Sequence, residues 1–109
     1  MICEQWDVIV VPFPFAESMD SKRRPALVLS RGTFNSAGHS VMAMITSAAH
    51  QAWPGDCEVT DRTAAGLRLR CIVRLKLFTL DNRLAISRLG ALGHEDRAAV
   101  TAALRTFLF

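Results

Sequence analysis

The sequence predicts a mainly β (α+β) domain: a strongly bent sheet or barrel of about five to seven short strands, followed by one C-terminal helix. Two patterns predict this fold. Short apolar runs rich in Val, Leu and Phe recur between Pro, Gly or charged residues, as buried strands do. Near the C-terminus the apolar residues change to a helical period. A length of 109 residues suits one domain, residues 1–109, with a single core.

The expected strands of the first half are residues 6–11, 26–30 and 40–46. Residues 12–14, Pro-Phe-Pro, should end the first strand because proline cannot donate to a sheet ladder. Loop-forming Gly, Asn and Ser residues make 32–39 a connection with room for one helical turn. The third strand is apolar throughout and ends on two hydroxyl residues, Thr46 and Ser47.

The expected strands of the second half are residues 56–60, 70–78 and 84–92, with turns at 64–66 and 81–82. Strict alternation divides 70–78 into two faces. One face holds Arg70, Ile72, Arg74, Lys76 and Phe78, and the other holds Cys71, Val73, Leu75 and Leu77. This pattern predicts a strand with one core face and one strongly basic face.

The last element should be an amphipathic helix that begins near Glu95 and packs on the sheet. Its expected apolar stripe is Val100, Ala103, Leu104, Phe107 and Leu108. Glu95 and Asp96 fall in the first turn, where the helix dipole favours negative charge.

The composition limits the classes of protein. Half of the residues are apolar and the mean hydropathy is +0.22, so we expect a homodimer interface to bury part of this apolar surplus. The sequence has neither signal-peptide features nor an apolar run of bilayer length, which predicts a cytoplasmic protein without membrane contact. Cys3, Cys57 and Cys71 lack metal-site or redox spacing, so we expect no metal or cofactor.

The distribution of charge is more informative than the net charge of +3. Nine of the 13 basic residues lie in two windows, 21–55 and 62–80, that contain no acidic residue. If the fold brings these windows together, they form a basic face that attracts a polyanion in a salt-sensitive way. Stacking of bases could then involve Trp6, Trp53 or a Phe.

Arg24 is the most conspicuous basic residue. It precedes Pro25, which restricts its backbone to extended geometry at the entrance of the second strand. A guanidinium held in this way can grip a phosphate with two parallel hydrogen bonds. The alternative is that residues 22–24, Lys-Arg-Arg, form a solvated charge run without a ligand.

Several motifs occur in order along nearly the whole chain: WDVIVVPFPF, KRRPALVLS, a strand ending in ITS, GD followed by AGL, VRLKLFTLDNRL and LGAL. In this order and spacing they resemble the MazF/PemK family of toxins from type II toxin–antitoxin modules. The resemblance implies an SH3-like barrel with a C-terminal helix, acting as a homodimer. It also implies sequence-selective, metal-independent cleavage of single-stranded RNA, mainly mRNA, to 2′,3′-cyclic phosphate and 5′-hydroxyl ends, which inhibits translation and growth.

The resemblance also implies partners and site residues. A cognate antitoxin would block the active groove, and operator DNA would be bound only through the toxin–antitoxin complex. Arg24 and Thr46 match the catalytic arginine and threonine of the family, and Arg74 resembles a second arginine of the PemK branch. That branch has an acidic residue shortly after this arginine, whereas Leu75 and Lys76 stand here. The expected RNA-binding residues are Lys22, Arg23, Ser47, Arg70 and Lys76.

The general base is not defined by the motifs. RNA supplies its own 2′-hydroxyl nucleophile, but arginine holds its proton too strongly to be an easy base. Glu17, in the loop before Arg24, is the candidate; His39 and His50 compete with it, and His94 is expected to be structural. Two alternatives stay open: a non-catalytic nucleic-acid-binding barrel, and an inactive family member that acts as a partner of the antitoxin and operator.

Overall fold

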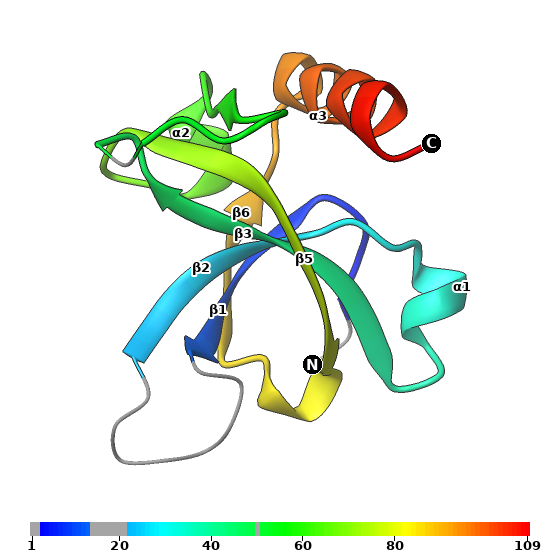
Figure 1. The fold of residues 1–109 in the computed structure, drawn as a ribbon. Helices are drawn as coiled ribbons and strands as arrows, with labels where there is room; N and C mark the ends of the chain where they lie inside the picture. Colours follow the sequence, from blue (N-terminus) through cyan, green and yellow to red (C-terminus); the bar gives the residue numbers. More distant parts are fainter. Residues whose placement is uncertain (1–2, 14–21, 50) are drawn as a thin grey trace.

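The computed structural model describes residues 3–13, 22–49 and 51–109 of the chain. Its strands are β1 (Asp7–Phe13), β2 (Lys22–Val28), β3 (His39–Ser47), β4 (Cys57–Glu58), β5 (Cys71–Asp81) and β6 (Ser87–Ala91). The helices are α1 (Gly32–Asn35), α2 (Arg62–Ala65), the 3-10 turn η1 (Asn82–Leu84) and α3 (His94–Phe107). The strands form one six-stranded antiparallel sheet in the order β4-β5-β3-β2-β1-β6 (Figure 1). This curled sheet with a C-terminal helix confirms the predicted mainly β fold.

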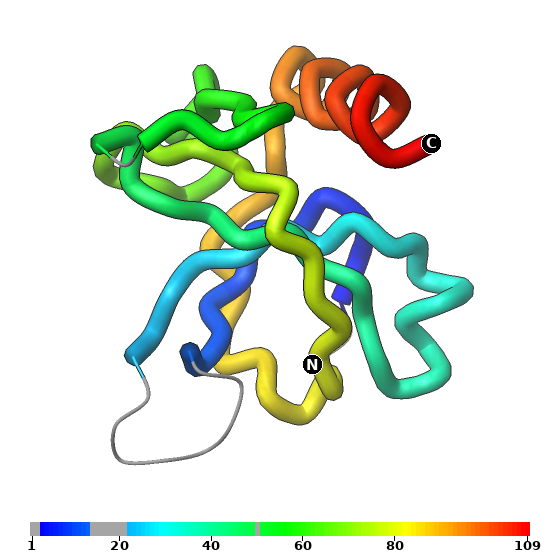
Figure 2. The backbone as a smooth tube through the Cα atoms, viewed as in Figure 1, coloured from blue at the N-terminus to red at the C-terminus, as the bar shows by residue number. Residues whose placement is uncertain are grey.

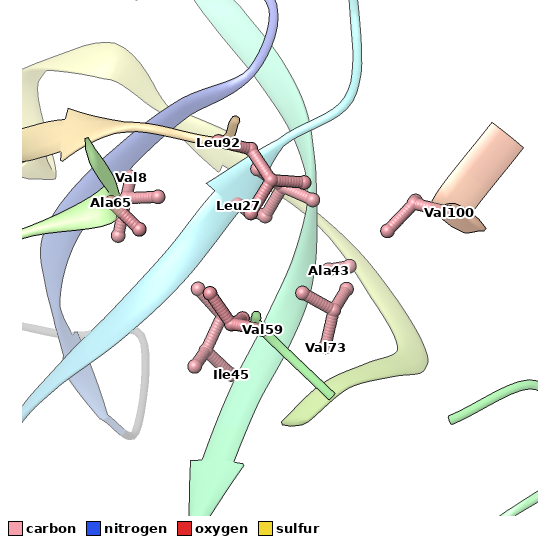
Figure 3. Packing of buried hydrophobic residues seen from close by; sticks show 9 residues of the cluster. All are labelled: Val8, Leu27, Ala43, Ile45, Val59, Ala65, Val73, Leu92 and Val100. Atoms are coloured by element: carbon pink, nitrogen blue, oxygen red, sulfur yellow. The ribbon is translucent and has the colours of Figure 1, made fainter. Parts of the chain in front are cut away.

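Each face of the sheet carries a cluster of buried apolar residues. Neighbouring residues on the central strands point to opposite sides and so belong to different clusters. Figure 3 shows the first cluster, to which α2 and α3 contribute: Val8, Leu27, Ala43, Ile45, Val59, Ala65, Val73, Leu92 and Val100. The second cluster lies on the opposite face: Cys3, Ile9, Val11, Ala26, Val28, Met42 and Leu80. Burial on two faces explains why the strand sequences are apolar runs rather than clean alternations.

The pairing of β3 with β5 shifts in the middle of both strands. Ala43 pairs with Leu77, whereas the next residue, Met44, pairs with Arg74. Two residues of β5, Leu75 and Lys76, are therefore extra at this point, and such a bulge bends the strand. Figure 2 follows the bent path of β3 and β5 across the molecule.

The bulge makes the predicted alternation of residues 70–78 partly wrong. Leu77, which strict alternation places on the core face, is 41% exposed. Arg74, which was expected on an open basic face, is only 9% exposed. Alternation is a local rule, and it fails where a register shift re-aims the side chains.

Several element boundaries also differ from the predicted ones. β2 begins at Lys22, so the basic cluster lies inside the strand and not in a loop before it. β1 continues through Pro12 to Phe13, and among the described strands this end of β1 pairs with β2 alone, since its pairing with β6 covers only Asp7 to Val10. Proline is tolerated at such an edge. A helix, α2, stands where a simple turn was expected.

The terminal helix α3 confirms its predicted amphipathic start but not its whole apolar stripe. Val100 and Ala103 are buried, and Leu104 packs against the first cluster. Phe107 is 54% exposed, and Leu108 is exposed as well, so the end of the helix does not pack on the sheet as expected. Large apolar side chains are thus left on the surface of the described chain.

Candidate nucleic-acid-cleavage site

The candidate site lies on the face of the sheet that carries the second cluster, beyond the buried residues of that cluster. The residues Ile9, Val11, Ala26 and Met42 are in the second cluster, and the same face continues along each strand to Phe13, Arg24, Met44 and Thr46. The pairing of β2 with β3 ends at Ala26 and Met44; Arg24 and Thr46 each lie two residues beyond it on their strands and line the same hollows. The two residues of the predicted pair therefore come together on neighbouring strands.

Arg24 and Thr46 line two adjoining hollows. The first, here called the basic pocket, has a volume of about 290 Å³ and is lined by Phe13, Arg24, Met44, Ile45, Thr46, Arg74 and Lys76. The second, of about 410 Å³, is lined by Arg24, Thr46, Ser47 and the segment 66–71, together with Pro25, Ile45 and Leu89. A chain passing from one hollow to the other would cross Arg24 and Thr46.

Arg24 carries a buried donor at the site. Its Nε atom is buried and has no hydrogen-bond partner among the described residues, and its guanidinium lies 5.5 Å from the centre of the Phe13 ring. A buried donor left without an acceptor costs about 1–3 kcal/mol. A phosphate oxygen would supply the missing acceptor, and a guanidinium suits phosphate geometry.

Arg74 is held firmly beside the same pocket. Its Nε and Nη2 atoms donate to Asp56 Oδ1 and Oδ2 over 3.1 and 2.9 Å, and Nη2 also donates to the Gln51 carbonyl over 2.6 Å. The hydrogen bond from Arg74 lowers the pKa of Asp56, and the same bond raises the pKa of Arg74. Asp56 is not among the predicted site residues, although it belongs to the GD motif and directly follows an acid-free window.

Trp53 lies next to this ion pair. Its ring centre is 5.8 Å from the Arg74 guanidinium and 4.8 Å from Lys76 Nζ, and the residue is 42% exposed. The candidate stacking residue of the loop is therefore found beside two site cations. Trp6, the other tryptophan considered, is partly buried against the first cluster and lines a different hollow.

The remaining predicted RNA-binding residues are exposed around the two hollows or on β2. Lys22 and Arg23 are exposed on β2, and Ser47 is exposed at the end of β3. Arg70 lines the second hollow, but it forms an exposed ion pair with Glu58 at 2.7 Å. Glu58 and Asp56 thus form ion pairs with two arginines of the expected basic face. Fewer unpaired cations are left on this face than the acid-free windows of the sequence predict.

Of the histidines and the glutamate considered as bases, only His39 and His94 belong to the described residues, and neither lies at the site. Glu17 and His50 lie outside the described residues. His39 pairs with Asp81 at the opposite end of β3 from Thr46, and His94 is the exposed first residue of α3. Within the described ranges, no group of three or more His, Cys, Asp or Glu side chains could hold a metal ion.

A family model described as PemK-like, MazF-like toxin of type II toxin–antitoxin system matches residues 4–108. The chain belongs to this family. No curated protein matches it by sequence. The family match confirms the resemblance predicted from the ordered motifs.

Solved structures of MazF/PemK-family toxins share the fold. A MazE–MazF crystal structure from Deinococcus radiodurans gives a TM-score of 0.77 at 21% identity, covering 99% of this chain and 97% of that one. The Mycobacterium tuberculosis toxin MazF-mt6 gives 0.74 at 18% identity, covering 92% and 93%. A mycobacterial endoribonuclease in complex with its cognate antitoxin gives 0.74 at 16% identity, covering 97% and 94%. Among the described helices, none is long and apolar enough to cross a membrane.

Proposed function

We propose that this MazF/PemK-family toxin is a sequence-selective, metal-independent endoribonuclease that cleaves single-stranded RNA, mainly mRNA, and so inhibits translation and growth. The observation that supports it most is the buried Nε of Arg24, which has no hydrogen-bond partner among the described residues and lies with Thr46 at the junction of two hollows. We infer that Arg24 binds a phosphate and that the Thr46 hydroxyl is a hydrogen-bond donor beside it. Both are suited to a phosphodiester in an extended strand.

The proposed chemistry uses the RNA's own nucleophile. The 2′-oxygen bonds to the adjacent phosphorus and loses its proton to a base, while the bond from phosphorus to the 5′-oxygen breaks and that oxygen gains a proton. The products are a 2′,3′-cyclic phosphate and a 5′-hydroxyl. Arg24 and Arg74 stabilise the negative charge of the phosphorane, and Thr46 donates to one of its oxygens. Losing one such preorganised donor costs about 100- to 1,000-fold in rate.

Glu17 stays our proposal for the base that accepts the 2′-hydroxyl proton, and it lies outside the described residues. Asp56 is the acidic residue nearest to Arg74 in the described chain, but it is a poor base. Both of its oxygens accept hydrogen bonds, from Arg74 and from the Trp53 backbone, and its pKa is lowered by the bond from Arg74. A carboxylate in this state binds protons weakly.

We also propose that the toxin acts in the cytoplasm as a homodimer that a cognate antitoxin inhibits, with operator DNA bound only through that complex. Exposed apolar side chains at the end of α3 and on β5 support a protein interface: Leu77, Phe107, Leu108 and Phe109. Solved structures with the same fold include a mycobacterial endoribonuclease in complex with its cognate antitoxin. Light scattering at low micromolar concentration tests the dimer, and a monomeric mass would contradict it.

The test of the activity is incubation of the purified protein with a long mixed-sequence RNA in excess EDTA, with every new end mapped and chemically typed. We expect discrete cuts with cyclic-phosphate ends that are lost in Arg24→Ala. Arg83→Ala is a matched control, because Arg83 is exposed and pairs with Asp81 at the far end of β5. Intact RNA with salt-sensitive binding would favour a non-catalytic binding barrel, and neither cutting nor binding would favour an inactive partner of the antitoxin.

A further inference from the structure

We propose that Asp56 is a positioning residue for RNA cleavage: its carboxylate fixes the Arg74 guanidinium so that the free edge of the guanidinium faces the basic pocket. The inference rests on the proposed function and deepens it, because it assigns a role to a residue outside the expected site. Asp56 does not line the basic pocket, so its influence on the reaction passes through Arg74.

The hydrogen bonds of Arg74 define which edge is available. A guanidinium has five N–H donors in a rigid plane. Two donors, on Nε and Nη2, bind Asp56, and Nη2 also binds the Gln51 carbonyl. No hydrogen bond within the described chain uses Nη1, so its two N–H groups are left for an acceptor in the pocket that Arg74 lines.

The segment that carries Asp56 is built to hold it in place. The Trp53 backbone N–H donates to Asp56 Oδ2 over 2.9 Å, and the Asp56 N–H donates to the Trp53 carbonyl over 3.0 Å. Gly55 has a φ of 81°, and an added Cβ would lie 2.5 Å from Leu75 Cδ1 on the bulged part of β5. A tight turn packed against β5 therefore points the carboxylate at Arg74.

Burial makes the Arg74–Asp56 ion pair more rigid than an ordinary surface ion pair. The side chains of Arg74 and Asp56 are 10% and 14% exposed. By contrast, Arg70 and Glu58 also form a two-point pair, over 3.4 and 2.7 Å, but their side chains are 69% and 47% exposed. Shielded, two-point pairs fix geometry, whereas exposed pairs contribute little. Placing a reacting group wrongly by about 1 Å can reduce a rate by about 100-fold.

The test measures single-turnover cleavage rate and RNA affinity separately for wild type, Asp56→Asn, Arg74→Ala and the double variant. We expect Asp56→Asn to lower the cleavage rate by about ten- to 100-fold while RNA affinity stays within about threefold. We expect the double variant to be no slower than Arg74→Ala, because Asp56 acts only through Arg74. Losses that multiply in the double variant, or a normal rate in folded Asp56→Asn, would overturn the inference.

Two further variants keep the result interpretable. Asp56→Glu retains the paired charge, so it should fold even if Asp56→Asn does not. Because its longer side chain displaces the Arg74 guanidinium, we expect a cleavage rate between those of wild type and Arg74→Ala. A wild-type rate in Asp56→Glu, if Asp56→Asn does not fold, would overturn the inference. Asp81→Asn is the matched control, since it breaks an exposed pair with Arg83 and should leave the rate unchanged. If wild type cuts no RNA, the proposed function fails and this inference with it.

Discussion

Arg74 and Asp56 lie 18 residues apart in the sequence, and their side chains meet in a two-point ion pair with N–O distances of 3.1 and 2.9 Å. The pair links the bulged centre of β5 to the turn before β4. It joins a predicted site residue to one that the sequence motifs did not assign. Stability and activity should therefore respond together when this pair is changed.

Arg74→Ala should lower the free energy of unfolding by more than about 1 kcal/mol, because it leaves the largely shielded Asp56 carboxylate without its counter-ion. Replacing both partners, as in Arg74→Met with Asp56→Leu, should recover most of that loss since no lone charge remains. Urea unfolding followed by circular dichroism measures both changes. A loss below about 1 kcal/mol in Arg74→Ala would mean that the pair is solvated like a surface pair.

Arg24→Met should affect stability and activity in opposite ways. The substitution removes the buried Nε, which has no partner in the described part of the chain, and keeps an unbranched apolar side chain of similar length, so the free energy of unfolding should stay unchanged or rise by about 1 kcal/mol. RNA cleavage should fall by at least about 100-fold. Thermal unfolding and the mapped-end RNA assay give the two readouts. Marked destabilisation would show that Arg24 has a structural role instead.

Asp96 should make the fold acid-sensitive. It is buried at the start of α3 and accepts hydrogen bonds from the Thr60 backbone, the Thr60 hydroxyl over 2.7 Å and the Asp61 backbone over 3.0 Å. Burial alone would raise the pKa of Asp96, but these hydrogen bonds hold it below the ordinary value. As the pH falls, the unfolded chain therefore takes up the proton first.

The stability contributed by Asp96 is thus present above about pH 4 and is lost as the pH decreases through the folded-state pKa. Asp96→Asn should lower stability by about 1–3 kcal/mol at pH 7 and make its dependence on pH below about 4 shallower. Urea unfolding at a series of pH values tests this. An unchanged acid dependence in the variant would contradict it. Asp61→Asn is a comparison that changes a neighbouring exposed carboxylate, which caps α2 through Ala64.

Trp53 should report RNA binding if a base stacks beside the basic pocket. Trp53→Ala should weaken binding of single-stranded RNA by about 1–3 kcal/mol, and Trp53→Phe should recover part of that affinity. The affinity should be measured by fluorescence anisotropy of a labelled oligonucleotide at fixed salt, because salt dominates such affinities. Phe34→Ala is the control, since Phe34 is exposed on α1 and lines neither hollow of the site. Equal losses in both variants would rule out a specific role for Trp53.

Local sequence patterns predicted much of the fold because the strands are short apolar runs bounded by Pro, Gly or charge. The helical period of the apolar residues predicted the terminal helix, and the burial of Val100 and Ala103 agrees with it. Element ends were less predictable: β2 extends back to Lys22 because pairing with β1 continues as far as Phe13. No property of Lys22 itself requires that pairing.

The sequence by itself identified the family through its ordered motifs, and it predicted Arg24 and Thr46 as a site pair. Only the tertiary structure decided what surrounds that pair. The two-residue bulge at Leu75 and Lys76, the capture of Arg74 by Asp56 and the exposure of Leu77 all depend on how β5 meets distant segments. Alternation and motif spacing act over a few residues, whereas a register shift and a long-range ion pair are set by packing between strands.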